Sequence, residues 1–403
     1  MFGRILLILC LGLLAAACDD VTGPGQPPIE ALPRELSPQE AALVEAGNGF
    51  TFKLFQRLVQ EEPAGNVFVS PLSVSMVLGM LLNGAAGETR SEIEVALGLS
   101  ALTIEEINRA YRDLIDLLLG LDPSVETGVA NSIWIREGFP VVPEFLAVNR
   151  EFFAAEVGDF GDAGSVDRIN AWVDEHTNGR ITRIVEEIRP QDVMFLINAI
   201  YFKGLWRIPF DPDDTRPEPF HRPDGSQVEV ALMTVDSIFP HSLTERYQAV
   251  DLPYGGGAFT MTVVLPAEGS TTADLVAELD AAGWKALTEG LQTEFLQVLL
   301  PRFELEYEKT LNEALQDLGI RKAFTDADFS RLTPGGGVWL DYVKQKAFVK
   351  VDEEGTEAAA VTVGGIATSA PPSFRADRPF VFAIRERFSG TILFVGVVTD
   401  PSS

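Results

Sequence analysis

The sequence predicts an α+β fold in which helices pack against mainly antiparallel sheets. Helical patterns dominate the N-terminal half of the chain, and strand-like runs dominate the C-terminal half. No internal repeat occurs, and strands do not alternate regularly with helices. A parallel sheet built from βαβ units would require that alternation, so we expect antiparallel pairing.

The first helix has a well-defined start. Ser37 is a suitable N-cap, Pro38 fits the first helical position, and Glu40 completes a capping box. Apolar residues at helical spacing extend this pattern to about residue 60. Further helical patterns cover residues 71–83, 88–97, 103–119, 166–177 and 309–318.

The strand-like runs are rich in β-branched and aromatic residues. They cover Val129–Arg136, Val193–Phe202, Ala258–Leu265, Phe295–Pro301, Ala347–Val351, Pro379–Arg385 and Thr391–Val398. Residues 211–227 have the composition of a charged surface loop. Residues 354–378 differ from both kinds of segment, because they join an Ala- and Gly-rich run to two prolines and contain few bulky side chains.

The composition is that of a globular, strongly acidic protein. Of 403 residues, 46% are hydrophobic and 22% are charged, which excludes a collagen-like or wholly disordered chain. The 31 basic and 59 acidic side chains give a net charge of −28. Such a surface repels phosphate backbones and sulfated polysaccharides, so we expect neither nucleic acid nor a heparin-type polyanion as a partner.

The N-terminus is typical of an export signal. Arg4 precedes an apolar run from Ile5 to Leu14, which is shorter than the ~18–20 residues that a spanning helix needs. Small residues then lead to Cys18, an arrangement that resembles a bacterial lipobox, although Ala15 stands where leucine is more usual. We expect lipid attachment at Cys18, with cleavage by ordinary signal peptidase as the alternative.

The sequence contains no recognisable catalytic or metal-binding motif. Cys10 and Cys18 both lie in the signal-like stretch, so neither can form a disulfide or a metal cluster in the folded body. The three histidines, His176, His221 and His241, lie in helical or polar loop contexts, and no GxSxG, HExxH, CxxC, GxGxxG or phosphate-binding loop occurs. We therefore expect a protein that is not an enzyme and has no cofactor or metal.

Residues 353–363, EEGTEAAAVTV, are unusual for an exposed segment. An exposed loop gains little from a run of alanines, but in a strand such small side chains could pass between two neighbours without a clash. One interpretation is a flexible linker or a short surface helix. The other is a strand held in reserve, able to pair later with an open sheet through its backbone.

Several motifs between residues 45 and 401 decide between these interpretations. They are Asn66–Ser73, Gly84–Thr89, Asn198–Gly204 with Trp206, Phe210, Thr215 and Phe220, Pro301–Phe303, Asp328–Ser330, Lys346–Val349 and Arg378–Phe380. In this order and at this spacing, the chain resembles a member of the serpin family of serine protease inhibitors. One such motif would be weak evidence, but the ordered series is specific.

The resemblance implies the serpin fold, with three β-sheets, about nine helices and an exposed reactive-centre loop that can enter the main sheet as an added strand. It also implies a suicide mechanism. A target serine protease attacks the loop and forms an acyl-enzyme, and insertion of the cut loop then distorts the protease before water can release it. We therefore expect a metastable monomer that forms a covalent acyl complex with its target protease.

The family register assigns the hinge of this loop to Gly355, Thr356, Glu357, Ala358, Ala359, Ala360, Val361 and Thr362. Alternate hinge positions from Thr356 to Thr362 face the core after insertion, and none of them is charged or bulky. Insertion should therefore cost little, as an inhibitory serpin requires. Val361 departs from the alanine that is usual in the family, but its side chain is expected to face outward.

The scissile bond follows from the same register. Counting forward from Gly355 places it between Ser369 and Ala370, whereas counting back from Phe380 places it between Thr368 and Ser369. We prefer the Ser369–Ala370 bond, because the length of loop on the hinge side decides how far the protease is carried.

The residues that the specificity pockets of a protease would contact are mostly small and are all uncharged. They are Ile366, Ala367 and Thr368, followed by Ser369 and Ala370. Elastase-like and subtilisin-like pockets accept such side chains, whereas a trypsin-like pocket requires Arg or Lys.

Five further positions match family residues that control opening of the main sheet. Ser70 and Ser73 match the serines of the region called the shutter, Asn198 matches their polar neighbour, and Trp206 matches the breach, where the loop first enters. Gln345 stands where many members have histidine. A pH-sensitive shutter is therefore not expected at this position.

The resulting domain organisation has three parts. Residues 1–18 form a signal peptide with the lipobox cysteine, residues 19–36 a flexible tether, and residues 37–403 a single serpin domain. We expect an exported cell-envelope lipoprotein, periplasmic or at the cell surface, whose only membrane contact is the N-terminal lipid. A non-inhibitory binding or structural lipoprotein on the same fold is the alternative.

Overall fold

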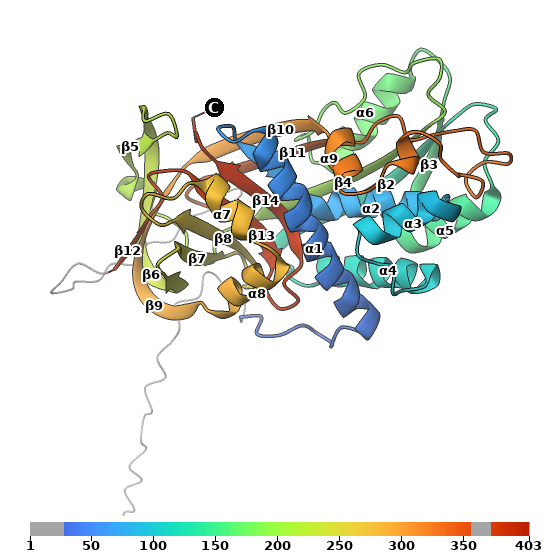
Figure 1. Ribbon diagram of the computed structural model, residues 1–403. Coiled ribbons are helices and arrows are strands. Elements are labelled where there is room, and N and C mark those ends of the chain that lie inside the picture. Colours follow the sequence, from blue (N-terminus) through green and yellow to red (C-terminus); the bar gives the residue numbers. More distant parts are fainter. Residues whose placement is uncertain (1–27, 356–371, 403) are drawn as a thin grey trace, which may run out of the picture.

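The computed structural model describes residues 28–355 and 372–402, and in this part the chain forms nine α-helices and three β-sheets (Figure 1). This agrees with the predicted α+β fold of three sheets and about nine helices. The helices are α1 (Pro38–Glu61), α2 (Pro71–Leu82), α3 (Gly87–Ala96), α4 (Ile104–Gly120), α5 (Pro143–Phe153), α6 (Ser165–His176), α7 (Thr272–Glu278), α8 (Ala281–Glu289) and α9 (Asn312–Asp317).

The largest sheet has nine strands in the order β1-β14-β13-β8-β7-β6-β9-β12, with β5 paired to β6. Its strands are β1 (Val67–Val69), β5 (Arg216–His221), β6 (Gln227–Leu243), β7 (Tyr247–Pro253), β8 (Phe259–Pro266), β9 (Gln292–Pro301), β12 (Ser373–Arg375), β13 (Phe380–Glu386) and β14 (Ile392–Val398). Strands β8, β13 and β14 are buried along their whole length, which explains their continuous apolar sequences.

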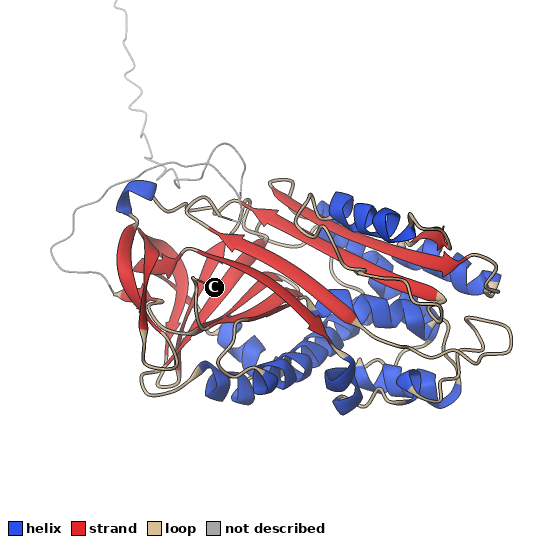
Figure 2. Cartoon of the chain, turned by 90° about the horizontal axis from the view of Figure 1, so that it is seen from above, coloured by secondary structure: helices blue, strands red, loops and turns tan. Residues whose placement is uncertain are grey.

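The two smaller sheets contain the remaining five strands. A three-stranded sheet has the order β3-β2-β4, and a two-stranded sheet pairs β10 with β11. Their members are β2 (Val125–Arg136), β3 (Glu156–Phe160), β4 (Met194–Gly204), β10 (Phe303–Thr310) and β11 (Lys344–Val351). In Figure 2 the long strands of these sheets lie over the layer of helices.

Strand β4 separates two hydrophobic clusters. Phe195, Ile197 and Ala199 pack with Trp172 of α6, whereas Leu196 and Ile200 face the main core that contains α2. This alternation is the expected period of two in a strand. Helices α2 and α6 therefore cover opposite faces of β4.

The predicted long elements agree with the structure, but the interpretation of residues 211–227 as a loop is wrong. This segment contains β5, which pairs antiparallel with β6. Its two prolines and its charged side chains are unusual for a strand. The prolines are tolerated because β5 is paired on only one side. Helices α5, α7 and α8 were also not predicted, because their 11, 7 and 9 residues are too few to be stable without tertiary packing.

The end of the segment expected to be a tether contacts the domain. The Ile29 N–H donates to the Gly256 carbonyl at 2.9 Å, and Arg34 forms an ion pair with Glu40, a buried carboxylate of α1. Leu32 packs against the main core. In the described residues, none of the helices combines the length and apolar character needed to cross a membrane.

A buried ion pair links three strands of the large sheet. Arg385 of β13 and Asp251 of β7 are 3% and 4% exposed, and Arg385 Nη2 lies 2.6 Å from Asp251 Oδ2. Thr262 of β8 donates its hydroxyl to Asp251 and accepts a hydrogen bond from Arg385 Nε. Every charge in this cluster therefore has a partner, as burial requires.

The substitution Arg385→Met should destabilise the domain by about 3–5 kcal/mol, because it removes the cation that is paired with the buried Asp251 carboxylate. A lower midpoint of urea-induced unfolding, followed by circular dichroism, would show the loss. The matched control is Arg57→Met, since Arg57 pairs with the exposed Asp317 and should matter little. Equal effects of the two substitutions would contradict the assignment.

Candidate functional site

The most distinctive feature of the molecule is a gap between two strand edges. Among the described strands, β4 pairs only with β2, and β11 pairs only with β10. Both free edges line a cavity of about 300 Å³. A smaller cavity of about 20 Å³ lies farther along the same two strands, at residues 200–203 and 348–350. The gap therefore follows the edges of β4 and β11 for most of their length.

The walls of the larger cavity come from both faces of β4. Val74 and Val77 of α2 line it from one face, and Val173 of α6 lines it from the other. Ile181 and Val185, which follow α6, also contribute. The walls are thus mostly aliphatic, with backbone edges between them, and a strand with small side chains fits such a space.

Ser70 connects α2 to the large sheet. It is the N-cap of α2, and its hydroxyl accepts a hydrogen bond from the Ser73 N–H at 3.3 Å. The same hydroxyl donates to the Leu393 carbonyl of β14 at 2.7 Å. Both serines are buried and line the cavity.

Two side-chain amides reach the cavity from the facing strands. Gln345 of β11 donates to the Ser70 carbonyl at 2.7 Å, and Asn198 of β4 donates to Asn131 Oδ1 at 2.8 Å. The amide oxygens of Gln345 and Asn198 are buried and accept no hydrogen bond from the described residues. Buried acceptors of this kind are uncommon, and they offer partners to polar groups that enter the gap.

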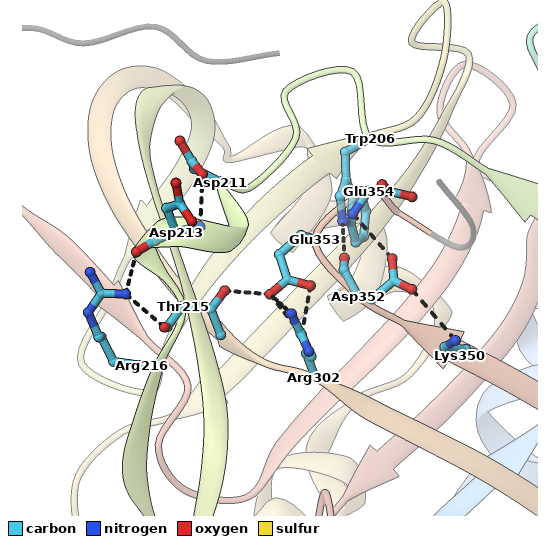
Figure 3. A network of polar contacts seen from close by, with 10 residues as sticks. All are labelled: Trp206, Asp211, Asp213, Thr215, Arg216, Arg302, Lys350, Asp352, Glu353 and Glu354. Atoms are coloured by element: carbon cyan, nitrogen blue, oxygen red, sulfur yellow. Dashed lines mark hydrogen bonds and ion pairs between the residues drawn. The ribbon is translucent and has the colours of Figure 1, made fainter. Parts of the chain in front are cut away.

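The gap is closed where β4 and β11 end (Figure 3). Trp206 donates its indole N–H to the Asp352 carbonyl at 2.9 Å, and its backbone N–H donates to the Glu354 carbonyl at 2.9 Å. The indole stacks on Tyr254 with ring centroids 4.4 Å apart. Trp206 therefore joins the ends of the two strands.

Gly355 fits this junction because it has no side chain. Its φ of +132° is a conformation that other residues rarely adopt. A Cβ atom at this position would lie 2.4 Å from the Gly204 carbonyl oxygen and 2.6 Å from the Trp206 nitrogen. The first residue of the expected hinge is thus packed directly against the backbone at the end of β4.

An ion pair next to the junction was not assigned a role from the sequence. Arg302 Nε lies 2.7 and 2.6 Å from the two carboxylate oxygens of Glu353, and Thr215 donates its hydroxyl to the same carboxylate (Figure 3). Burial would raise the pKa of Glu353, but the hydrogen bonds from Arg302 and Thr215 and the charge of Arg302 outweigh it and lower that pKa. The antiparallel pairing of β10 with β11 brings Arg302 and Glu353 together, although they are far apart in the sequence.

The structure brings four of the five predicted control residues to the cavity: Ser70, Ser73, Asn198 and Gln345. It places Trp206 at the closed end. The other predicted site residues lie outside the described residues. They are Cys18, Thr356, Glu357, Ala358, Ala359, Ala360, Val361, Thr362, Ile366, Ala367, Thr368, Ser369 and Ala370.

Comparison with known proteins identifies the family. The family model described as serpin (serine protease inhibitor) matches residues 45–401. The chain belongs to the serpin family. An uncharacterized serpin-like protein of Thermococcus kodakarensis is 35% identical over 378 residues, covering 90% of this chain and 87% of the relative.

Solved serpin structures superpose closely on this one. The thermophilic serpin tengpin in its native state has a TM-score of 0.82 at 28% identity, and the match covers 93% of this chain and 96% of tengpin. Human thyroxine-binding globulin in complex with thyroxine has a TM-score of 0.83 at 29% identity, with 90% and 99% of the two chains covered. The serpin arrangement of sheets and helices is therefore common to this chain and both structures.

The substitution Arg302→Ala should loosen the junction and destabilise the domain by about 1–3 kcal/mol, since it removes the cation from a carboxylate that is only 5% exposed. Hydrogen exchange followed by mass spectrometry should show faster exchange at Trp206 and Phe210, whose N–H groups donate to the carbonyls of Glu354 and Glu353. Arg302→Lys should give an intermediate effect, because lysine keeps the charge but not the paired geometry. Unchanged exchange in both variants would contradict this role.

Proposed function

We propose that this serpin is a suicide inhibitor of serine proteases that prefer small residues, such as elastase-like and subtilisin-like enzymes. The observation that carries the proposal is the cavity between the free edges of β4 and β11, which continues along both strands toward the junction at Gly355. A strand entering this gap would find backbone donors and acceptors on both sides.

The chemistry begins on the protease. Its serine Oγ attacks the carbonyl carbon of Ser369, the Ser369–Ala370 peptide bond breaks, and the new amine of Ala370 takes the proton from the protease histidine. The N-terminal part of the inhibitor is then held to the protease by an ester. Hydrolysis of that ester competes with insertion of the cut loop.

Two features of the chain favour loop insertion over hydrolysis of the ester. The inward-facing hinge positions carry only Thr and Ala side chains, which fit between aliphatic walls without steric or charge penalty. Insertion would also give hydrogen-bond partners to strand edges that now have none in the described sheets. This gain in backbone pairing provides the driving force for insertion. The native form, in which the loop is not inserted, is held by a kinetic barrier.

Incubation with pancreatic elastase or subtilisin should give a complex that survives SDS and a released C-terminal peptide. The peptide's N-terminal residue, read by mass spectrometry, should be Ala370, whereas an N-terminal Ser369 would assign the cut to the Thr368–Ser369 bond. Trypsin should form no complex, because the expected bait region contains no Arg or Lys.

The matched control is Thr356→Arg, which places a charge at the first inward-facing hinge position. This variant should be cut at the same bond without forming a stable complex, because insertion would bury an unpaired charge. Cleavage of the unmodified protein without complex formation by every protease of this class would refute the inhibitory proposal.

The second candidate is a non-inhibitory binding protein on the same fold, and the similarity to thyroxine-binding globulin gives it support. The two candidates differ in what cleavage does to stability. In an inhibitor, cutting the loop should raise the thermal unfolding temperature markedly, since the loop becomes a central strand. An unchanged unfolding temperature after a verified cut would favour the binding protein.

We also propose that the inhibitor is exported and held at the cell envelope by lipid at Cys18, in keeping with its signal-like N-terminus. The net charge of −28 makes activation by heparin-type polyanions unfavourable. Its partner would then be a protease that reaches the periplasm or the cell surface.

A further inference from the structure

Residues 180–192, which we call the bridging segment, run from the region after α6 to the start of β4 and lie across the gap. Ile181, Ile184 and Val185 line the cavity together with residues of both β4 and β11. A strand that enters the gap must pass this segment. How the segment is held on each side therefore affects insertion.

On the β4 side the segment is held by buried amide hydrogen bonds. Asn170 of α6 is 8% exposed, and its Oδ1 accepts from the N–H groups of Ile184 and Val185 at 2.9 and 3.0 Å. Its Nδ2 donates to the Val185 carbonyl at 2.7 Å. Arg136 of β2 donates to the carbonyls of Arg189 and Asp192 at 2.7 and 2.6 Å. These contacts fix the segment to the three-stranded sheet and its helix.

On the β11 side the segment is held by ion pairs. Glu186 Oε1 lies 3.0 Å from Lys344 Nζ of β11, and Arg189 forms an ion pair with Asp341, just before that strand. The Arg189 guanidinium also lies 5.5 Å from the centre of the Tyr342 ring. These contacts fix the same segment to the two-stranded sheet.

The two kinds of attachment differ in strength. A strand inserted between β4 and β11 must lie about 4.8 Å from each of them, so the two edges have to move apart wherever they stand closer than two such spacings. An ion pair at 3.0 Å cannot persist through such a displacement unless the segment leaves its amide contacts. The Glu186 and Asp341 side chains are 67% and 45% exposed, so their ion pairs are screened by water and salt, whereas the Asn170 bonds are buried. The ion pairs should break first.

We propose that the ion pairs Glu186–Lys344 and Arg189–Asp341 are a brace across the gap that sets the rate of loop insertion, and with it the fraction of proteases trapped. This inference rests on the proposed inhibitory function. The brace slows opening of the sheet before a protease arrives, and it also slows insertion after the cut. Glu186 and Asp341 are thus positioning residues that act through the bridging segment.

The test compares the double variant Glu186→Gln, Asp341→Asn with a control of equal charge, Glu175→Gln, Glu187→Gln. In the part of the chain that the structure describes, neither the Glu175 nor the Glu187 side chain forms an ion pair with β11. The stoichiometry of inhibition of subtilisin is measured for unmodified protein and both variants, at low salt and at about 0.5 M salt. In the brace variant, the ratio of cleaved inhibitor to complex should be about twofold to fivefold lower per lost ion pair than in the control at low salt. The difference between the two variants should be smaller at high salt.

A second measurement does not depend on any protease. Hydrogen exchange at the edge amides of β4 and β11 should be faster in the brace variant than in the control, since the sheet opens more often. Exchange equal to that of the control would overturn the brace, and equal stoichiometry in the two variants would overturn its effect on trapping. Failure of the unmodified protein itself to form any complex would instead refute the proposed function, whatever the exchange data show.

Discussion

The structure depends on one physical requirement: the backbone N–H and C=O groups at the edge of a strand need hydrogen-bond partners. Backbone N–H and C=O groups are almost always hydrogen-bonded when they are removed from water, and free edges are normally covered, paired or blunted. Here two long edges, those of β4 and β11, face each other across a cavity instead. Helix α2 supports the gap from one face, the bridging segment covers it from the other, and the contacts of Trp206 and Glu353 close its end.

The polar groups at the gap are of two kinds with different physical properties. Buried amides and hydroxyls, such as Ser70, Asn170 and Gln345, make short hydrogen bonds that do not depend on salt. Charged pairs lie nearer the surface, where water and ions weaken them. The first kind fixes the local structure, whereas the second is the weaker attachment between the three-stranded and the two-stranded sheet.

The strong negative charge of the chain is balanced locally along this site. Lys346 of β11 pairs with Glu306 of β10, and Lys344 pairs with Glu308 of β10 as well as with Glu186. The cations of β11 are thus surrounded by carboxylates and do not form a basic surface. Cations paired in this way hold the neighbouring strands and segments together.

Much of this protein could be predicted from the sequence, because some of its features are local. The capping box of Ser37 and Glu40 determines where α1 begins, and long apolar runs predict β8, β13 and β14. Short helices such as α8 and the proline-containing β5 escaped prediction, since tertiary packing and pairing with β6 stabilise them. The motif series placed Ser70, Asn198 and Gln345 at one site, and its order and spacing were sufficient to indicate the serpin family. The contacts of Arg302 with Glu353 and of Glu186 with Lys344 across the gap could not be predicted, because side chains far apart in the sequence meet only after the strands have paired.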